Sequence, residues 1–328
     1  MRPASRQRVA AIAVIAAALV LVATADRAVA ADEQLRVGKA VAGPFDFVPL
    51  DVGIETGIFK KHNLTITEID FDGSAKLQQG LGADAIDIGL GSGPELAFVA
   101  KGNSDIAIAA FAGPPDSQVV AVAKDGPIRS VVGLKGTRVG VSTVGSLTDW
   151  LVRELARQQG WGTDGIETVA LGSEAGRLAS LRTGSTDGMV TDVGSAIHLE
   201  EDGVTRTIVH FGHVAPDFII HAIFATQKLV AARPDAVRQF LAGWFETIAW
   251  MRANKDATVK LVAPVMHQTP VIVSINYDQV MPTFSATGKF DAKALAVLSR
   301  SFVEMKLLPA EPAMSRLYTE AFLPGAGK

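Results

Sequence analysis

Residues 35–71, LRVGKAVAGPFDFVPLDVGIETGIFKKHNLTITEIDF, contain the smallest unit from which the fold class follows. Residues 35–40 predict a β-strand, and residues 47–59 predict a helix that ends near Gly57. Residues 64–71 alternate apolar and polar side chains, which is typical of a second strand. A strand, a helix and a strand joined by short turns form a βαβ unit, which predicts an α/β protein with a parallel sheet.

The same alternation continues along the chain and restarts after a turn at residues 124–127. From Arg233 onward the pattern is mostly helical. We therefore expect two α/β lobes with a hinge, the first formed by residues 31–123 plus 222–328 and the second by residues 124–221. In open α/β sheets a ligand lies beyond the carboxyl ends of the strands, so the expected binding site is the cleft between the lobes.

The first thirty residues resemble a targeting segment rather than a part of the fold. Three arginines in the first eight residues precede the apolar run 9–23, and Ala28-Val29-Ala30 matches the small-x-small cleavage pattern. We expect a signal peptide of residues 1–30, cleaved after Ala30, and a periplasmic mature protein. The alternative is an uncleaved N-terminal anchor.

Composition narrows the classes of function. The net charge is −3 for the 328 residues and −6 for residues 31–328, because four arginines and one aspartate lie in the first thirty. There is no basic excess for a nucleic-acid partner. The chain contains no cysteine, which excludes disulfides, thiolate metal ligands and a cysteine nucleophile.

Four passages resemble the exported solute-binding proteins of ABC importers, in particular the nitrate/sulfonate/taurine group that is also called SsuA/THI5-like or NMT1-like. Leu35–Gly38 followed by Asp51–Leu64, with Gly57-Ile58-Phe59, carries the strongest match. The other three passages are Leu81–Gly89, Val131–Val141 and Thr186–Thr191. The second passage departs mildly from the family pattern where Asp84-Ala85 replaces a common glycine, and the third departs where Gly133 replaces a frequent aspartate.

This resemblance implies a type II periplasmic-binding fold, in which two lobes close around a small solute. It also implies delivery of that solute to an ABC permease in the inner membrane by a protein that we expect to be a monomer. The family binds nitrate, sulfonates, taurine, carboxylates and pyrimidines, and a small organic anion fits the residues described next.

Small polar residues follow three predicted strands, at the points where helices begin. Unpaired backbone N–H groups at a helix N-terminus, together with hydroxyl groups, bind anionic oxygens. The alternative is ordinary helix capping by Ser146 and Ser195, and for Asp192 we favour the cap. The candidate ligand-binding residues in these turns are Ser92, Gly93, Pro94, Ser142, Thr143, Gly145, Ser146 and Asp192.

Aromatic residues supply candidate apolar walls. The loop after the first strand contains Phe45, Asp46 and Phe47, and Phe111 ends a later strand. The alternative for Phe45 and Phe47 is that one of them staples the following helix to the core. Lys39, Lys76 and Arg177 lie near predicted strand ends and could add positive charge.

Two further kinds of site are considered and set aside. His210, His213 and His221 cluster in sequence, but no carboxylate-rich partner motif accompanies them, so we expect no metal site; a hinge or cleft role for His221 stays open. The turn at Gly89-x-Gly91 lacks the third glycine of a dinucleotide fingerprint, so we expect no cofactor.

We expect a binding protein and not an enzyme. Enzymes that make the thiamine pyrimidine resemble this family but carry a cysteine-rich motif, and Gly91-Ser92-Gly93 is too short a match to a nucleophile elbow. The alternatives that remain are a sensor subunit for a membrane receptor, and binding or synthesis of a thiamine-pyrimidine precursor on the same scaffold.

Overall fold

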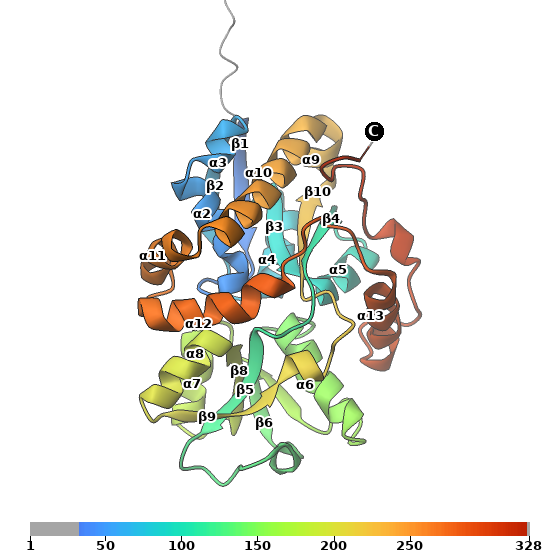
Figure 1. The fold of residues 1–328 in the computed structure, drawn as a ribbon. Helices are drawn as coiled ribbons and strands as arrows, with labels where there is room; N and C mark the ends of the chain where they lie inside the picture. The colour runs from blue at the N-terminus through green and yellow to red at the C-terminus, as the bar shows by residue number, and fades with distance from the viewer. Residues whose placement is uncertain (1–32, 327–328) are drawn as a thin grey trace, which may run out of the picture. The chain divides into compact units, whose positions relative to one another are not determined.

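Strand β1 (Glu33–Lys39) pairs in parallel with β2 (Leu64–Asp70) along its whole length, as the pattern in residues 35–71 predicts. The structure is a computed structural model that describes residues 33–326, so the predicted signal peptide lies outside the described residues. Strand β1 also pairs in parallel with β3 (Ile88–Ser92). The βαβ unit of the sequence is therefore the start of a sheet (Figure 1).

The helix expected at residues 47–59 is broken into two. Helix α2 (Val48–Glu55) ends before Gly57, which has a left-handed backbone with φ 72°, and α3 (Ile58–Lys61) begins after it. An L-residue with a side chain rarely adopts this conformation, so glycine is the residue that permits the break. The short 3-10 helix η1 (Phe45–Phe47) leads into α2.

The first sheet has mixed strand directions, which corrects the expectation of a parallel sheet. Its order is β2-β1-β3-β10-β4, and β10 (His221–Thr226) runs antiparallel to both β3 and β4 (Asp105–Ala112). Because β10 returns from the second half of the chain, the two halves are joined by two crossovers. Crossover 1 is residues 113–117 and crossover 2 is residues 211–220.

The second sheet repeats this plan in the order β7-β6-β8-β5-β9. Strand β5 runs antiparallel to β8 and β9, although sequence analysis assigns its residues to the first lobe. The chain changes sheets at Gly113-Pro114-Pro115 instead of at the turn 124–127, because the buried run of β5 fits either sheet and only its partners decide. The strands are β5 (Gln118–Ala123), β6 (Arg138–Val141), β7 (Glu167–Ala170), β8 (Gly188–Asp192) and β9 (Thr205–His210).

Helices accompany both sheets and make up most of the chain after Arg233. The helices of the two sheets are α4 (Ser74–Gly82), η2 (Gly93–Glu95), α5 (Leu96–Ala100), η3 (Val131–Leu134), α6 (Leu147–Gln158), α7 (Glu174–Arg182), α8 (Val193–Glu201) and η4 (Phe211–His213). The C-terminal helices are α9 (Gln227–Ala232), α10 (Pro234–Ala253), α11 (Lys255–Val265), α12 (Pro270–Val280), η5 (Met281–Thr283), α13 (Ala292–Glu304) and η6 (Met314–Arg316).

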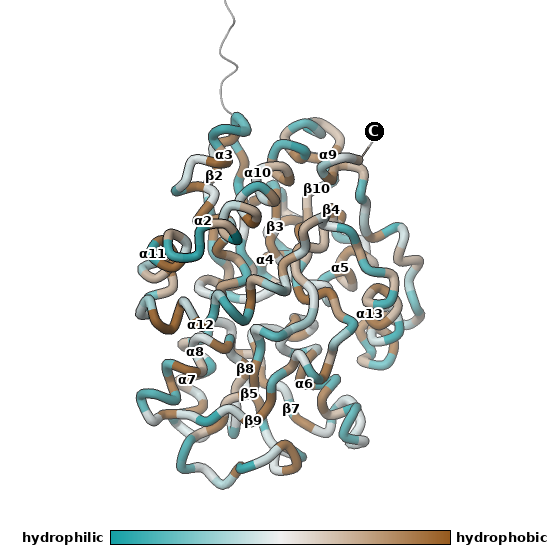
Figure 2. Tube along the Cα trace, viewed as in Figure 1, coloured by the Kyte–Doolittle hydropathy of each residue, from teal (hydrophilic) through white to brown (hydrophobic). Residues whose placement is uncertain are grey.

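The largest cluster of buried apolar side chains draws on both sheets and on the C-terminal helices. Hydrophobic residues are frequent along the strands, while hydrophilic residues are frequent along the outer loops (Figure 2). Among the helices of residues 33–326, none combines the length and the hydropathy that a membrane crossing needs.

Helices of the C-terminal part connect the two sheets. Helix α12 contacts α8, and the indole Nε1 of Trp150 on α6 donates a hydrogen bond to Ser301 Oγ on α13 over 2.8 Å. Arg153 on α6 donates to the carbonyl of Met305 over 3.0 Å. The second sheet is thus held at both ends, on either side of the cavity described next.

Candidate functional site

A cavity of about 60 Å³ lies between the two sheets. One water molecule needs about 10–15 Å³ of such space, so the cavity accepts a solute headgroup of a few non-hydrogen atoms. The first sheet and the segments joined to it contribute Ala40, Val41, Ala42, Pro44, Phe47, Ser74, Gly91, Ser92, Glu95 and His221. The second sheet and its helices contribute Gln118, Ser142, Leu147, Thr148, Glu174, Arg177 and Asp192.

The first-sheet wall is built around a fully buried carboxyl group, that of Glu95. Ser92 and Glu95 form a capping box, in which the backbone N–H of Ser92 donates to Glu95 Oε1 over 2.9 Å. The other carboxyl oxygen, Oε2, accepts from Gln78 Nε2 over 2.9 Å. Burial raises the pKa of Glu95 to about 7, although hydrogen bonds from Gln78, Ser74 and Ser92 oppose this shift. The Glu95 carboxyl occupies the space that a Cβ at position 91 would take, so this position accommodates only glycine without a shift of Glu95.

The second-sheet wall presents hydroxyl groups at the start of α6. The Thr148 hydroxyl accepts from the backbone N–H of Ser142 over 2.9 Å, and it lies 3.1 Å from Ser142 Oγ and 3.0 Å from Ser146 Oγ. Ser146 caps the helix by accepting from the N–H of Asp149 over 3.3 Å. The expected alternative of ordinary capping therefore describes Ser146, while Ser142 and Thr148 line the cavity.

Arg177 places a buried positive charge in the cavity wall. Its Nε donates to the carbonyl of Val190 over 2.9 Å and its Nη1 to that of Gly172 over 2.6 Å. Within residues 33–326 the guanidinium forms no ion pair, so backbone carbonyls alone hold it. Burial lowers the pKa of Arg177, and the charges of Glu174 and Asp192 oppose that shift. A guanidinium held in this way keeps N–H groups for an anionic partner.

Asp192 and Glu174 lie beside this cation. Asp192 caps α8 by accepting from the N–H of Ser195 over 3.0 Å, as the favoured interpretation of the sequence predicts. The Ser195 hydroxyl lies 2.8 Å from Asp192 Oδ2 and 3.2 Å from Glu174 Oε2. Burial, with the nearby charge of Glu174, raises the pKa of Asp192 to about 7. A protonated Asp192 would leave the wall less negative.

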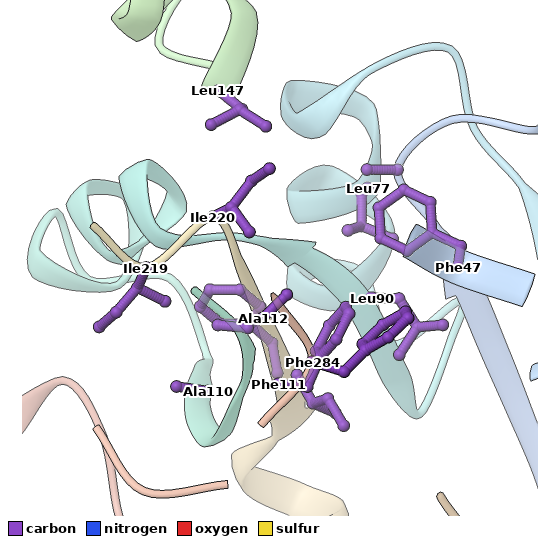
Figure 3. Packing of buried hydrophobic residues seen from close by; sticks show 14 of the residues in the cluster. Phe47, Leu77, Leu90, Ala110, Phe111, Ala112, Leu147, Ile219, Ile220 and Phe284 are labelled. Atoms are coloured by element: carbon purple, nitrogen blue, oxygen red, sulfur yellow. The ribbon is translucent and has the colours of Figure 1, made fainter. Parts of the chain in front are cut away.

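Aromatic side chains gather beside the cavity. Phe47 lies on the wall, and its ring centroid is 6.3 Å from that of Phe111 and 4.7 Å from that of His221. Figure 3 shows Phe111 next to Phe284, Phe47 next to Leu77, and Leu147 at the top of the view, at the start of α6. The cavity therefore has an apolar part as well as a polar one.

Of the twelve candidate binding residues, four line the cavity: Phe47, Ser92, Ser142 and Asp192. The other eight lie behind its wall or beside it. Phe45 packs edge-on against Tyr277 in the core, Asp46 and Phe111 are buried next to His221, and Gly93 is packed against the carbonyl of Ile219. Pro94, Thr143, Gly145 and Ser146 serve helix starts and contacts between the sheets.

The three suggested cations have different positions. Arg177 lines the cavity, whereas Lys39 is buried among Asp51, Glu68 and Asp70, and Lys76 pairs with Asp72 at the surface over 2.9 Å. Lys39 is thus neutralised inside the first lobe. Only the position of Arg177 suits a role toward a solute.

Sequence analysis missed several wall residues. Glu95 had a readable signal, because Ser-x-x-Glu before an apolar run is a capping box. Thr148 and Glu174 lie inside predicted helices, where nothing local distinguishes a cavity face from a solvent face. Gln118 was missed because its strand was assigned to the other lobe.

The three histidines that cluster in sequence differ in their burial. His210 and His213 are exposed, whereas His221 is buried with its Nδ1 3.0 Å from the carbonyl of Gly91. Over the described part of the chain, no group of three or more potential metal ligands occurs.

The model of the NMT1/THI5-like family matches residues 44–258, which is more than half of the chain. No curated protein sequence matches the chain significantly. The family match covers both crossovers and most of the cavity wall.

Solved structures of similar fold include three binding proteins. The alkanesulfonate-binding protein SsuA from Xanthomonas axonopodis pv. citri, bound to MOPS, is 19% identical with a TM-score of 0.75, covering 87% of this chain and 98% of its own. The aliphatic sulphonate-binding SsuA from Escherichia coli is 20% identical with a TM-score of 0.70, covering 88% and 92%. The nitrate-binding protein NrtA from Synechocystis PCC 6803 is 14% identical with a TM-score of 0.70, covering 88% and 86%. These likenesses establish the two-lobed periplasmic-binding fold.

Proposed function

The chain belongs to the NMT1/THI5-like family, and from this premise we propose that it is the extracytoplasmic solute-binding protein of an ABC importer. Its two lobes would capture a small organic anion, such as a sulfonate, a carboxylate or a nitrate-like solute, and deliver it to a membrane permease. The observation that carries this proposal is a cavity between two sheets with Arg177 in its wall.

The charge of the wall supports an anionic solute. The described hydrogen bonds of the cavity-lining Arg177 go to neutral carbonyls, so its guanidinium keeps N–H groups that can donate to a bound anion, although Glu174 and Asp192 lie beside it. The hydroxyls of Ser142 and Thr148 and the start of α6 face the same space. Fixed donors of this kind offset the desolvation of an anion without reorganising.

The size and the apolar part of the cavity support a small organic solute. About 60 Å³ admits a headgroup of a few atoms, and Phe47 and Leu147 can contact a short hydrocarbon portion. Larger solutes would require the lobes to part, which the two crossovers permit as hinges. Among the proteins of similar structure, SsuA from Xanthomonas axonopodis pv. citri binds an alkanesulfonate and NrtA from Synechocystis PCC 6803 binds nitrate.

The cavity chemistry supports binding without turnover. Ser92 Oγ donates to Glu95 and Ser142 Oγ lies beside Thr148, so within the described residues neither serine hydroxyl has a histidine base as its partner. The chain contains no cysteine. The serine–histidine pair that activates many serine nucleophiles is thus not formed by these two serines within the described residues.

A thermal-shift screen of residues 31–328 tests the proposal. The panel contains methanesulfonate, taurine, nitrate, acetate, benzoate and a hydroxymethylpyrimidine, since binding to the native state alone raises the melting temperature. We expect a sulfonate or carboxylate to raise it, and calorimetry to give one site. Ala42 is exposed at the cavity rim, so Ala42→Trp should block the effect and Ala42→Ser should not. Shifts that survive Ala42→Trp, or none at all, would refute the proposal.

Location and partner are tested separately. Periplasmic export predicts that the cell-derived protein begins at residue 31 and is released by osmotic shock. Transport predicts that the loaded protein stimulates the ATPase of its permease, whereas a sensor subunit would change the activity of a receptor kinase instead. Scattering should give the mass of a monomer.

A further inference from the structure

His221, the first residue of β10, is held on several sides at the edge of the cavity. Its Nδ1 lies 3.0 Å from the carbonyl oxygen of Gly91. Its ring stacks on Phe111 at 5.4 Å with an interplanar angle of 11°, and Phe47 lies 4.7 Å away. The side chain is 5% exposed. The orientation of the ring is therefore fixed, and each nitrogen faces one known neighbour.

The neighbour of Nδ1 decides where the first proton lies. A backbone carbonyl can only accept a hydrogen bond, so Nδ1 must carry a hydrogen and donate it to Gly91. A neutral imidazole has one N–H and one lone pair. In the neutral ring the lone pair would then be at Nε2.

The neighbour of Nε2 is a buried carboxylate. Nε2 lies 3.5 Å from Asp46 Oδ1, and Asp46 is fully buried. Two acceptors facing each other in a buried site repel, whereas a second proton on the ring converts the contact into an ion pair. Within the described residues Nε2 forms no hydrogen bond, so Asp46 Oδ1 at 3.5 Å is the charged neighbour that acts on it, and Asp46 Oδ2 also lacks a hydrogen-bond partner.

Asp46 also receives the other crossover. Ser117, the last residue of crossover 1, donates from Oγ to Asp46 Oδ1 over 3.2 Å, and the amide of the cavity-lining Gln118 reaches the same hydroxyl over 3.5 Å. His221 directly follows crossover 2. A single carboxylate on η1 thus contacts the ends of both crossovers, one residue before Phe47 on the cavity wall.

The surrounding charges favour a second cation here. Asp192 on β8 is close enough to Asp46 for their charges to interact, and the Glu95 carboxyl lies against Gly91, the partner of Nδ1. Glu174 also lines the cavity. Besides a protonated His221, Arg177 is the positively charged side chain among the cavity-lining residues.

We propose that His221 carries a proton on both ring nitrogens in the native protein and forms a buried ion pair with Asp46 that holds the two crossovers together. His221 is then a positioning residue, because it fixes Phe47 and the hinge segments instead of reacting. This deepens the proposed function, on which its role toward a solute rests, but the charge state itself can be measured without any solute.

Nuclear magnetic resonance of the solute-free protein, labelled with ¹⁵N in histidine, tests the charge state. At pH 7 we expect both nitrogens of His221 to be protonated, and the exposed His210 and His213 serve as internal references. His221→Phe identifies the signal; if it does not fold, single substitutions of the other five histidines identify it by elimination. A lone pair at Nε2 at pH 7, or a proton on Asp46 instead, would overturn the proposal.

The ion pair is distinguished from simple packing by a double-mutant cycle of Asp46→Asn and His221→Phe in urea unfolding. Each variant changes the unfolding equilibrium constant by some factor relative to wild type. At pH 6 the factor for the double variant should be at least about tenfold smaller than the product of the factors for the two single variants. Ring packing alone predicts the same coupling at pH 6 and pH 9, whereas the ion pair predicts that it shrinks at pH 9, where histidine is neutral. A coupling independent of pH would contradict the ion pair.

Hydrogen exchange tests the link between the crossovers. Asp46→Asn should accelerate amide exchange at least about fivefold in residues 113–117 and 211–220, and leave β7 at the far edge of the second sheet unchanged. His213→Phe, on crossover 2 but exposed, should change neither. Equal acceleration throughout the chain would show a general loss of stability and would contradict the local role.

A protein that binds no solute but passes these three tests would refute only the proposed function, and the ion pair would stand.

Discussion

The side-chain oxygen Oγ1 of Thr143, on the loop after β6, accepts a hydrogen bond from the backbone N–H of Ala75 at the start of α4, over 3.3 Å. Thr143 belongs to the second sheet and Ala75 to the first, so this bond crosses the cleft. The Thr143 methyl also lies against Gly73, where a Cβ would come within 2.5 Å of it. The described arrangement of the sheets is therefore a closed one.

Thr143→Val should weaken solute binding by favouring the open form. The valine keeps the methyl contact with Gly73 and loses the hydrogen bond, whose net contribution is about 0.5–1.5 kcal/mol. Calorimetry with the best solute of the screen should show about two- to tenfold weaker binding. Thr67→Val, at an exposed position of β2, is the control and should bind normally. Equal affinities of the two variants would contradict the closing role of Thr143.

Arg177→Met should weaken binding of an anionic solute. A hydrogen bond to a charged group contributes about 1.5–3 kcal/mol, so we expect affinity to fall by at least about tenfold. Arg182→Met removes an exposed cation from the same helix and should leave affinity within about twofold. The measurement is calorimetry on both variants after their folding has been verified. Undiminished binding in Arg177→Met would show that the guanidinium does not contact the solute.

Glu95 should make stability fall as pH rises. Burial raises its pKa from 4.5 to about 7, so the native state binds a proton more tightly than the unfolded state does. That contribution is fully present below about pH 4 and is lost as pH rises through about 7. Relative to wild type, Glu95→Gln should gain on the order of 2 kcal/mol in urea unfolding between pH 5 and pH 8. Glu201→Gln, exposed on α8, is the control, and parallel pH profiles for all three proteins would be inconsistent with this account.

Gly93 is required by packing, not by a solute. A Cβ at Gly93 would lie 2.3 Å from the carbonyl oxygen of Ile219 on crossover 2, whereas one at Gly113 would meet nothing nearer than 3.6 Å. Gly93→Ala should therefore destabilise the protein by roughly 1–3 kcal/mol in urea unfolding. Gly113→Ala should cost much less. The reverse order would show that crossover 2 is free to move away from η2.

Local patterns were sufficient for most elements and insufficient for the site. The run 35–71 predicted β1, β2 and their parallel pairing because periodicity is a property of neighbouring residues. The sheet to which β5 belongs depends on pairing with β8 and β9, which lie about 70 to 90 residues later, and no local signal carries that information.

The same limit explains which of the predicted residues line the cavity. Ser92, Ser142 and Asp192 end strands, and the rule for α/β sheets places strand ends at the cleft. Phe45 and Phe47 are two residues apart on one short helix, and only tertiary packing turns the first into the core and the second into the cavity. Asp46 was proposed as a ligand-binding residue, whereas its carboxylate contacts Ser117 and His221.

A crystal structure of residues 31–328 with the best solute of the screen tests the central claim most directly. The account predicts density for the solute between the sheets, with its anionic group at Arg177 and contacts to Ser92 or Phe47 from one lobe and Ser142 or Thr148 from the other. A solute bound outside this cavity, or one that touches a single lobe while Arg177 faces only carbonyls, would contradict it.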